Sequence, residues 1–260
     1  MSFKHIISRD NPIFKQLKKL SENARERRAE SKTLLDGVHL IETYLDVFGE
    51  PELIIIPEGK SSLEATNLMQ TLADVNTIML PTLMFAELTP VVSSTGILAL
   101  VKTPKIAAPV DITFALMLED IQDPGNLGSM LRTALGAGVQ AVYLSKGCTD
   151  AWSPKALRGG QGAQFHLPIV EGVDLLEVVQ NFAGNTYATI LGGASLYAQD
   201  LSKPTAFIIG NEGAGLTSKL LNAASHQISI PMHENLESLN AGAATAICLF
   251  ERVRQIRVNH

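Results

Sequence analysis

The chain closes with the stretch SLNAGAATAICLFERVRQIR, residues 238–257, which opens like a helix start and carries three arginines towards its end. The first turn of a surface helix normally carries polar side chains, whereas this one carries small residues from Ala241 to Ala244. Small residues allow other atoms to approach the backbone closely. We therefore expect the beginning of this helix to lie against a ligand or against another stretch of chain.

One design occurs three times in the second half of the sequence. A strand-like run leads into a turn rich in glycine or asparagine, and a helix-like run follows. The three stretches are LMLEDIQDPGNLGSMLRTALGAG (116–138), FIIGNEGAGLTSKLL (207–221) and ISIPMHENLESLNAGAATAICLF (228–250). In open α/β sheets, ligands bind beyond the carboxyl ends of the strands, where helix N-termini offer free N–H groups. Three such loops in one domain predict a composite binding site.

The sequence divides into two α/β domains. Residues 1–103 alternate short strand and helix patterns and predict a small α/β domain. A stretch at 104–112 with two prolines and no periodicity predicts a linker. Residues 113–260 hold sixteen of the twenty glycines and predict a second α/β domain with a mainly parallel sheet.

The charge is distributed unevenly along the chain. The formal net charge is −5, but residues 1–33 hold nine Lys or Arg against four acids, so this leading segment carries +5 and the remainder −10. A basic segment on an acidic body is the asymmetry expected of an arm that guides a polyanion. A solvated helix face would give the same pattern, and charge alone does not separate the two interpretations.

Other features narrow the class of protein. No apolar run reaches transmembrane length and no signal-peptide core is present, so we expect a cytoplasmic protein without a membrane partner. Cys148 and Cys248 are expected to be reduced thiols, and Cys248 to be buried in packing. His226 and His233 lack the spacing of zinc ligands, so no metal site is predicted. His166 lies in a strand pattern and is expected to be a structural histidine.

Common nucleotide and hydrolase motifs are missing or misplaced. The stretch GAGVQA at 136–141 fits a dinucleotide-binding pattern, but it follows a helix and precedes a strand, which is the wrong order for gripping a phosphate. The sequence has neither a Walker-type phosphate loop nor the G-x-S-x-G elbow of acyl hydrolases.

The three stretches, in this order, resemble the SpoU (TrmH-like) RNA 2′-O-methyltransferases of the SPOUT class. The resemblance covers the whole second domain, and LRGGQGAQFHLPI (157–169) is also similar, although Gly160 stands where many members carry Ser. The matching residues of the three motifs are Asn126, Gly128 and Arg132, then Gly210, Asn211, Glu212 and Gly213, then Ile230, Pro231, Met232, Ser238, Leu239 and Asn240.

The first domain resembles the ribosomal-protein-like substrate-binding domain of the same family, through ISRDNPIFKQLKKL (7–20) and LLDGVHLIETYL (34–45). Asp36 stands where many members have Glu, and Ala241-Gly242 replaces a more usual Val-Ser. The resemblance implies that the C-terminal chain passes through a loop to form a deep trefoil knot. Knots are rare exceptions to the rules of chain topology, and periodicity alone does not predict one.

The resemblance also implies S-adenosylmethionine as the methyl donor and no metal. The leaving group of a sulfonium is neutral, so the site has to align donor and acceptor and to handle the hydroxyl proton. The adenine is expected in an apolar slot. The positions of this sequence assigned to the cofactor site are Gly192, Gly210, Asn211, Gly213, Ile230, Met232, Leu239 and Ala241.

Arg132 matches the family's catalytic position. Arginine is a poor general base because its pKa lies far above neutrality. We therefore interpret Arg132 as gripping the phosphate beside the target ribose and polarising the hydroxyl, with a surface i,i+4 partner on a helix as the alternative. Glu212 and Ser238 are candidates for handling or orienting the proton, and Asn126 and Asn240 supply amide donors and acceptors.

The resulting hypothesis is 2′-O-methylation of a ribose in ribosomal RNA, with Arg25, Arg27, Arg28 and Lys32 strengthening RNA binding. A tRNA methyltransferase, a catalytically inactive RNA-binding or assembly factor and a small-molecule methyltransferase are the alternatives. A homodimer through the second domain is expected, with AATAICLF (243–250) as the candidate contact.

Overall fold

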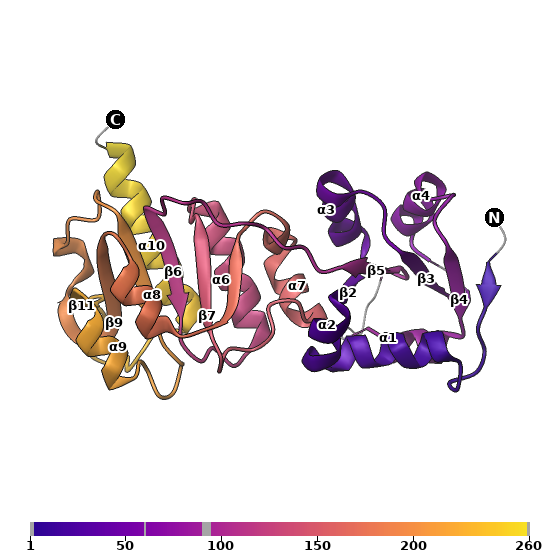
Figure 1. Ribbon diagram of the computed structural model, residues 1–260, viewed down its shortest axis with the longest axis horizontal. Helices are drawn as coiled ribbons and strands as arrows, with labels where there is room; N and C mark the ends of the chain where they lie inside the picture. Colours follow the sequence, from indigo (N-terminus) through magenta and orange to yellow (C-terminus); the bar gives the residue numbers. More distant parts are fainter. Residues whose placement is uncertain (1–2, 60, 90–94, 259–260) are drawn as a thin grey trace. The chain divides into compact units, whose positions relative to one another are not determined.

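The computed structural model describes residues 3–59, 61–89 and 95–258. The chain forms two compact units, each around its own sheet. The first comprises Met1–Pro104 together with Trp152–Phe165, and the second comprises Lys105–Ala151 together with His166–His260. Figure 1 follows the chain through both.

The first unit contains a five-stranded sheet in the order β1-β4-β3-β5-β2. Strand β5 runs antiparallel to both β2 and β3, whereas β4 runs parallel to β3 and β1. Its strands are β1 (Lys4–His5), β2 (Lys32–Asp36), β3 (Leu53–Pro57), β4 (Thr77–Leu80) and β5 (Leu98–Lys102). Its helices are α1 (Pro12–Glu22), α2 (Ala24–Glu30), α3 (Val38–Phe48), α4 (Leu63–Thr71), α5 (Thr82–Ala86), α7 (Pro154–Gly160) and the 3₁₀ turn η1 (Ala163–Phe165).

Helix α1 closes one side of the first core. Asn11 caps it by accepting a hydrogen bond from the backbone N of Ile13, and Pro12 occupies its first position. Both features favour a helix start. Phe14, Leu17 and Leu20 recur at helical spacing and pack into the buried cluster formed with the strands.

The segment Trp152–Phe165 packs with the first unit although its sequence lies between two strands of the second. The Thr33 hydroxyl donates to the carbonyl of Trp152 at 2.6 Å, and the ring of Phe165 lies 5.5 Å from that of Tyr44 and 6.3 Å from that of Phe48. The limits predicted from the sequence, 1–103 and 113–260 with a linker at 104–112, do not describe this excursion. As limits of independently folding domains they stay a prediction.

The second unit is built on a six-stranded sheet, all parallel, in the order β11-β9-β10-β6-β7-β8. The predicted α/β class with a mainly parallel sheet is therefore confirmed, while the trefoil knot stays a prediction. The strands are β6 (Phe114–Leu118), β7 (Ala141–Ser145), β8 (Ile169–Val173), β9 (Asn185–Ser195), β10 (Thr205–Ile209) and β11 (His226–Ser229). The helices are α6 (Pro124–Gly136), α8 (Leu175–Asn181), α9 (Ser218–Ala223), α10 (Ala241–Val258) and the 3₁₀ turn η2 (Leu196–Ala198).

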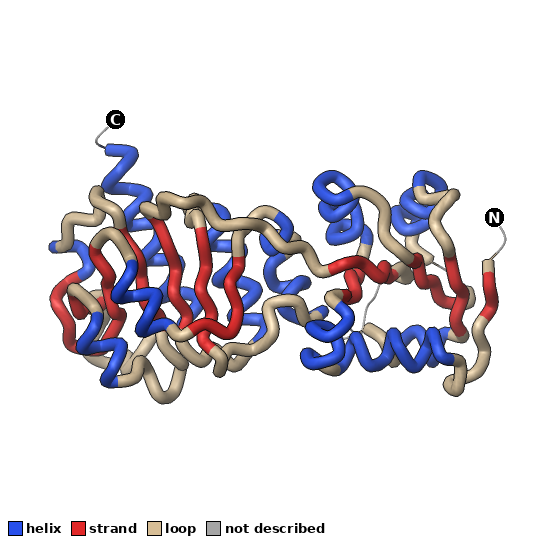
Figure 2. The backbone as a smooth tube through the Cα atoms, viewed as in Figure 1, coloured by secondary structure: helices blue, strands red, loops and turns tan. Residues whose placement is uncertain are grey.

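Alternating residues of the central strand β6 face two different helical layers. Ala115 and Met117 belong to a buried cluster with Leu175 of α8 and Leu220 of α9. Phe114 points to the other layer, where α10 packs against α6 and the Arg252 guanidinium lies 4.1 Å from the Phe114 ring centroid. Both faces of the sheet are therefore covered, as an all-parallel sheet requires. Figure 2 shows these strands with helices beside them.

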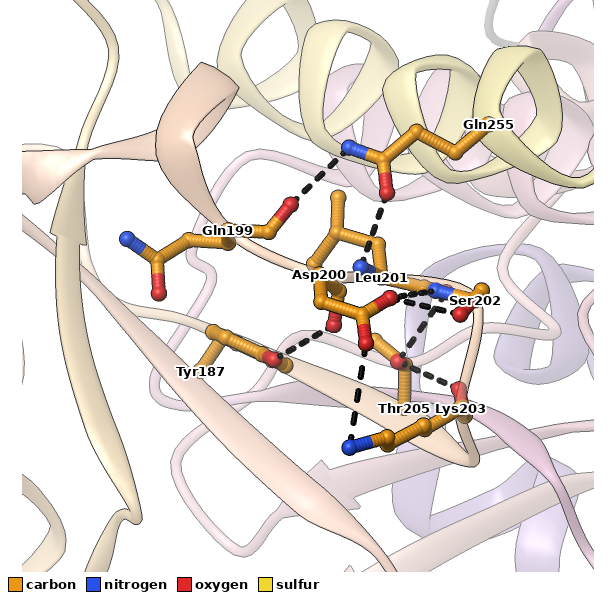
Figure 3. Close-up of polar contacts among 8 residues, drawn as sticks. All are labelled: Tyr187, Gln199, Asp200, Leu201, Ser202, Lys203, Thr205 and Gln255. Carbon is orange, nitrogen blue, oxygen red and sulfur yellow. Dashed lines mark hydrogen bonds and ion pairs between the residues drawn. The ribbon is translucent and has the colours of Figure 1, made fainter.

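Helix α10 is fixed to the loop between β9 and β10 by a side-chain amide (Figure 3). The Gln255 amide nitrogen donates to the carbonyl of Gln199 at 3.0 Å, and its oxygen accepts from the backbone N of Leu201 at 2.9 Å. The Tyr187 hydroxyl holds the same loop by donating to the carbonyl of Asp200 at 3.1 Å. These bonds set the position of α10 along the sheet, and so the position of its N-terminus.

Two further sequence expectations concern cysteine and the membrane. Cys248 is fully buried, as predicted, and burial raises the pKa of its thiol to about 12. Burial also raises the pKa of the Cys148 thiol. Within the described ranges, no helix is both long and apolar enough to cross a bilayer.

Candidate active site

The three motifs predicted from the sequence occupy one edge of the second sheet. Because the strands are parallel, their carboxyl ends meet at the same edge. Leu118 of β6 is paired with Ile209 of β10, so the loops that begin at Glu119 and Gly210 leave the sheet side by side. The third motif follows the end of β11, two strands away from β10 in the same sheet.

The first loop presents Asn126 at the start of helix α6. The carboxylate of Asp123 caps the helix by accepting from the backbone N of Asn126 at 2.7 Å, and Pro124 stands at the first helical position. Both features favour a helix start at this point. The Asn126 side chain is thereby placed in the first turn of α6, at the sheet edge.

Asn126 joins the other two motifs through its side-chain amide. Its nitrogen donates to Oε1 of Glu212 at 3.0 Å, and its oxygen accepts from the amide nitrogen of Asn240 at 3.2 Å. These residues lie 86 and 114 positions away from Asn126 in the sequence. Three predicted catalytic residues, one from each motif, therefore form one hydrogen-bonded cluster.

The second loop is a tight turn held by its own asparagine. The Asn211 side-chain oxygen accepts from the backbone N of Gly213 and of Ala214 at 2.8 and 2.9 Å, and its nitrogen donates to the carbonyl of Asp120 at 2.9 Å. The backbone of Asn211 also pairs with that of Gly215. A Cβ on Gly210 would lie only 2.4 Å from the Gly215 carbonyl carbon, so only glycine fits there.

The first two small residues of α10, Ala241 and Gly242, are buried, whereas Ala243 is exposed. Asn240 caps the helix, because its side-chain oxygen accepts from the backbone N of Gly242 and Ala243 at 2.9 and 3.2 Å. Gly242 is buried, and a Cβ added there would lie 3.9 Å from the Ser129 hydroxyl of α6. Helix α6 is therefore the neighbouring stretch of chain at Gly242, at ordinary van der Waals distance.

The other two predicted catalytic residues, Arg132 and Ser238, are both exposed. Arg132 lies on α6, and Ser238 lies in the loop before α10. Within the described part of the chain, neither side chain forms a hydrogen bond or ion pair. Both are accessible to a bound molecule. The structure therefore assembles Asn126, Glu212 and Asn240 but does not tie Arg132 or Ser238 to them.

The predicted cofactor residues follow the carboxyl ends of three neighbouring strands. Gly192 lies in the exposed end of β9 at φ 82°, Gly210 follows β10, and Ile230 follows β11. Met232 and Leu239 are half-buried, like Ile230, and Ala241 is buried. The Asn211 side chain is used within its own loop and against the carbonyl of Asp120, so this residue shapes the loop that Gly210 and Gly213 share.

The predicted RNA-binding residues of the first unit divide into two kinds. Arg25 and Arg28 are exposed on α2. Arg27 is only 4% exposed and donates to the carbonyls of Leu20 and Ser21 at 2.6 and 3.2 Å. The expectation that Arg27 contacts RNA is corrected here, because its guanidinium is used to hold α1 and α2 together. Lys32 forms an ion pair with Glu52.

Two residues that hold the site were not singled out from the sequence. Glu119 is buried, and its two carboxylate oxygens accept from the backbone N and hydroxyl of Thr217 at 2.7 and 2.8 Å. Ser145 at the end of β7 bonds to Asp120 at both its backbone N and its carboxylate. An acid directly after a fully apolar strand, as in FALMLE, was the available signal for Glu119.

Comparison with known proteins places this arrangement in a family. The SpoU rRNA methylase family model matches residues 113–250, which include all three motifs. The chain belongs to the SpoU rRNA methylase family. The family match therefore covers the whole cluster around Asn126.

Individual SpoU relatives match along nearly the whole chain. The 23S rRNA (guanosine(2553)-2′-O)-methyltransferase RlmP of Bacillus subtilis is 32% identical over 95% of this chain and 98% of its own. A solved RNA 2′-O ribose methyltransferase superposes with a TM-score of 0.82 at 29% identity, over 98% of this chain and 99% of its own. The SpoU methyltransferase AviRb from Streptomyces viridochromogenes, solved with AdoMet, has a TM-score of 0.82 at 26% identity, over 96% of this chain and 100% of its own.

The tight turn of the second motif yields a stability prediction. Gly210→Ala forces the Gly215 backbone to move, so we expect the free energy of unfolding to fall by about 1–3 kcal/mol. Gly213→Ala is the matched control, because its Cβ meets only the Asn211 side-chain oxygen at 3.5 Å. That variant should stay within about 0.5 kcal/mol of wild type in urea denaturation. Equal stability of the two variants would contradict the steric argument.

Proposed function

We propose that this SpoU protein transfers a methyl group from S-adenosylmethionine to the 2′-hydroxyl of a ribose in ribosomal RNA. The observation that carries the proposal is the cluster in which Asn126 joins Glu212 and Asn240, one residue from each motif of the family. Support also comes from relatives named as 23S rRNA 2′-O-methyltransferases and from the relative solved with AdoMet. A cytoplasmic location is part of the proposal.

The residues at the sheet edge fit S-adenosylmethionine. Ile230, Met232 and Leu239 are half-buried apolar side chains beyond the strand ends, which suits an adenine ring. Gly192 is exposed and open on its Cα side, so its backbone N–H and C=O groups can be reached by a ligand. When bound, the cofactor supplies an electrophilic methyl group on a sulfonium. Transfer of this methyl group leaves a neutral thioether, so no metal is needed to stabilise the leaving group.

Within this proposal the chain's own residues align the acceptor and handle its proton. Arg132 is exposed on α6 and can bind the phosphate next to the target ribose with its planar guanidinium. Glu212 uses Oε1 to accept from Asn126, which orients the carboxylate. In this proposal its other oxygen, or the exposed Ser238 hydroxyl, receives or relays the hydroxyl proton.

The share of this chain that each relative covers favours ribosomal RNA over tRNA as the target. RlmP aligns over both units, whereas a structure described by its 2-OH methylation of C/U34 on tRNA covers 56% of this chain. A catalytically inactive RNA-binding factor would need no intact cluster around Asn126. Stabilisation of the native protein by S-adenosylmethionine separates that alternative, since a ligand that binds only the native state raises its stability.

Arg132 gives the direct test of this function. Wild type should methylate a defined ribose of ribosomal RNA, mapped in RNA from cells with and without the gene. Arg132→Ala should remove most of this activity while calorimetry with S-adenosylmethionine shows nearly unchanged affinity. Arg132→Lys keeps the charge but loses the planar guanidinium with its paired N–H donors. Compared with Arg132→Ala, it should recover RNA binding more than turnover. Loss of cofactor binding in Arg132→Ala would assign Arg132 to the cofactor site or to folding.

RNA capture by the first unit is proposed to use the exposed arginines of α2. Each lost phosphate contact lowers the salt dependence of RNA affinity by about 0.7 to 0.9 log units per log unit of salt. Arg25→Ala with Arg28→Ala should therefore flatten the slope by about 1.4 to 1.8 if both arginines touch phosphate. Lys105→Ala with Lys203→Ala removes the same charge elsewhere and should leave the slope unchanged. Identical slopes for the two double variants would mean that the basic segment is only a solvated face.

A homodimer through the second unit is proposed from the surface of α10. Ala243 and Phe250 are exposed seven residues apart, which places them on one helix face with the half-buried Ile247 between them. Phe250 is 47% exposed and adds a large apolar side chain to this face. Light scattering should give about twice the chain mass of 28.0 kDa, and Phe250→Glu should lower it. A wild-type monomer that methylates RNA would contradict the dimer.

A further inference from the structure

Asp120, two residues after the last residue of strand β6, has a left-handed backbone with φ 54°. Only two other described residues besides glycine have positive φ, Ser31 and Gln161, and both are C-caps of helices. Left-handed residues are common at helix ends but uncommon elsewhere, because the Cβ crowds the following carbonyl. Asp120 follows a strand at the edge that carries the three motifs, so its conformation requires another explanation.

Strand β7 holds Asp120 in this conformation. The Ser145 hydroxyl accepts from the backbone N of Asp120 at 3.0 Å and donates to its Oδ1 at 2.6 Å. Gly147 leaves room for the carboxylate, because a Cβ there would lie 2.1 Å from the same Oδ1. One serine and one glycine from the next strand and turn thus fix both the backbone and the side chain of Asp120.

The left-handed turn aims the carbonyl of Asp120 at the second motif. That carbonyl accepts from the Asn211 amide nitrogen at 2.9 Å. Asn211 in turn binds the backbone N of Gly213 and Ala214, the two residues that follow Glu212. A continuous path of hydrogen bonds therefore runs from Ser145 through Asp120 and Asn211 to the turn that presents Glu212.

Hydrogen bonds rather than packing hold this path. Asp120, Ser145, Gly147 and Thr217 are among the residues that line a cavity of about 490 Å³. The Gln122 amide nitrogen also donates to the carbonyls of Asp120 at 3.3 Å and Gly147 at 2.8 Å. The backbone N and the carboxylate of Asp120, however, are both bound by the Ser145 hydroxyl.

We propose that Asp120 and Ser145 are positioning residues for methyl transfer: the strained turn at Asp120 sets the Asn211 amide and, through it, the place of the Glu212 carboxylate. The proposal rests on the proposed function for the role of Glu212. Neither residue touches the reacting atoms. Strain of this kind persists only where the surroundings over-determine it, and it concentrates at functional sites.

Three variants separate positioning from general stability. Asp120→Gly relieves the strain, since glycine adopts positive φ freely, but removes the carboxylate that Ser145 holds. Ser145→Ala removes both bonds to Asp120. Asp120→Asn keeps the acceptor oxygen and a residue that tolerates the left-handed region. Ser21→Ala, in the first unit, is the control for loss of a hydroxyl, which there donates to the carbonyl of Lys18.

The main readout is ribose methylation at saturating RNA and cofactor. We expect kcat to fall about tenfold to a hundredfold in Asp120→Gly and Ser145→Ala, because small misplacements of catalytic groups have effects of this size. KM for RNA should hardly change, since neither residue contacts the substrate. Asp120→Asn and Ser21→Ala should retain wild-type kcat. A fall in kcat that follows Tm across all four variants, or unchanged kcat in Asp120→Gly and Ser145→Ala, would overturn the proposal.

Hydrogen exchange provides a readout that does not depend on activity. The amides of Gly213 and Ala214 should exchange faster in Ser145→Ala and Asp120→Gly, and at the wild-type rate in Asp120→Asn. Wild-type protein that methylates no ribose would reject the proposed function, yet the exchange rates would still decide whether Asp120 holds the turn. Unchanged exchange at both amides would reject the positioning path itself.

Discussion

The site depends on the two hydrogen bonds that the side-chain amide of Asn126 forms. This amide donates to Glu212 and accepts from Asn240, so a single side chain relates three loops that are far apart in the sequence. An amide suits this task because it offers a donor and an acceptor in one fixed plane. A carboxylate at this position would repel Glu212 and an alkyl group would bind neither partner. The scaffold behind it serves to bring these three loops to one edge of a parallel sheet.

Several features of the second unit keep that edge rigid. Asn240 caps α10 at its N-terminus, and Gln255 fixes the same helix to the loop between β9 and β10. At the other side of the edge, buried Glu119 fastens the end of the second motif by accepting from Thr217. Each anchor uses backbone groups that would otherwise lack partners at helix ends and strand ends. The turns that form the site are therefore held from several directions before any ligand binds.

The sequence predicts the sheet edge well because its signals are local. Apolar runs ending in Gly/Asn-rich turns predict the strands and loops, and small residues from Ala241 to Ala244 predict close packing. Burial of Arg27 was not predictable, since a cation in a charged run reads as exposed until its carbonyl partners are placed. The left-handed turn at Asp120 also left no local signal, because its cause is Ser145, 25 residues away. The two features that the sequence did not predict both depend on contacts that are made only when the chain is folded.

The packing of Trp152–Phe165 with the first unit restricts how such a protein can be recombined. This segment lies inside the 113–250 match to the SpoU family, yet Thr33 and Tyr44 contact it from the other half of the chain. A chimaera joined at a single point near residue 104 would pair these residues with a foreign segment. Tyr44 and Phe48 would then face an aromatic partner that had not been selected with them. Exchange of the first unit between relatives therefore requires that two separate pieces of sequence move together. Inheritance should accordingly couple substitutions at Tyr44 with substitutions at Phe165.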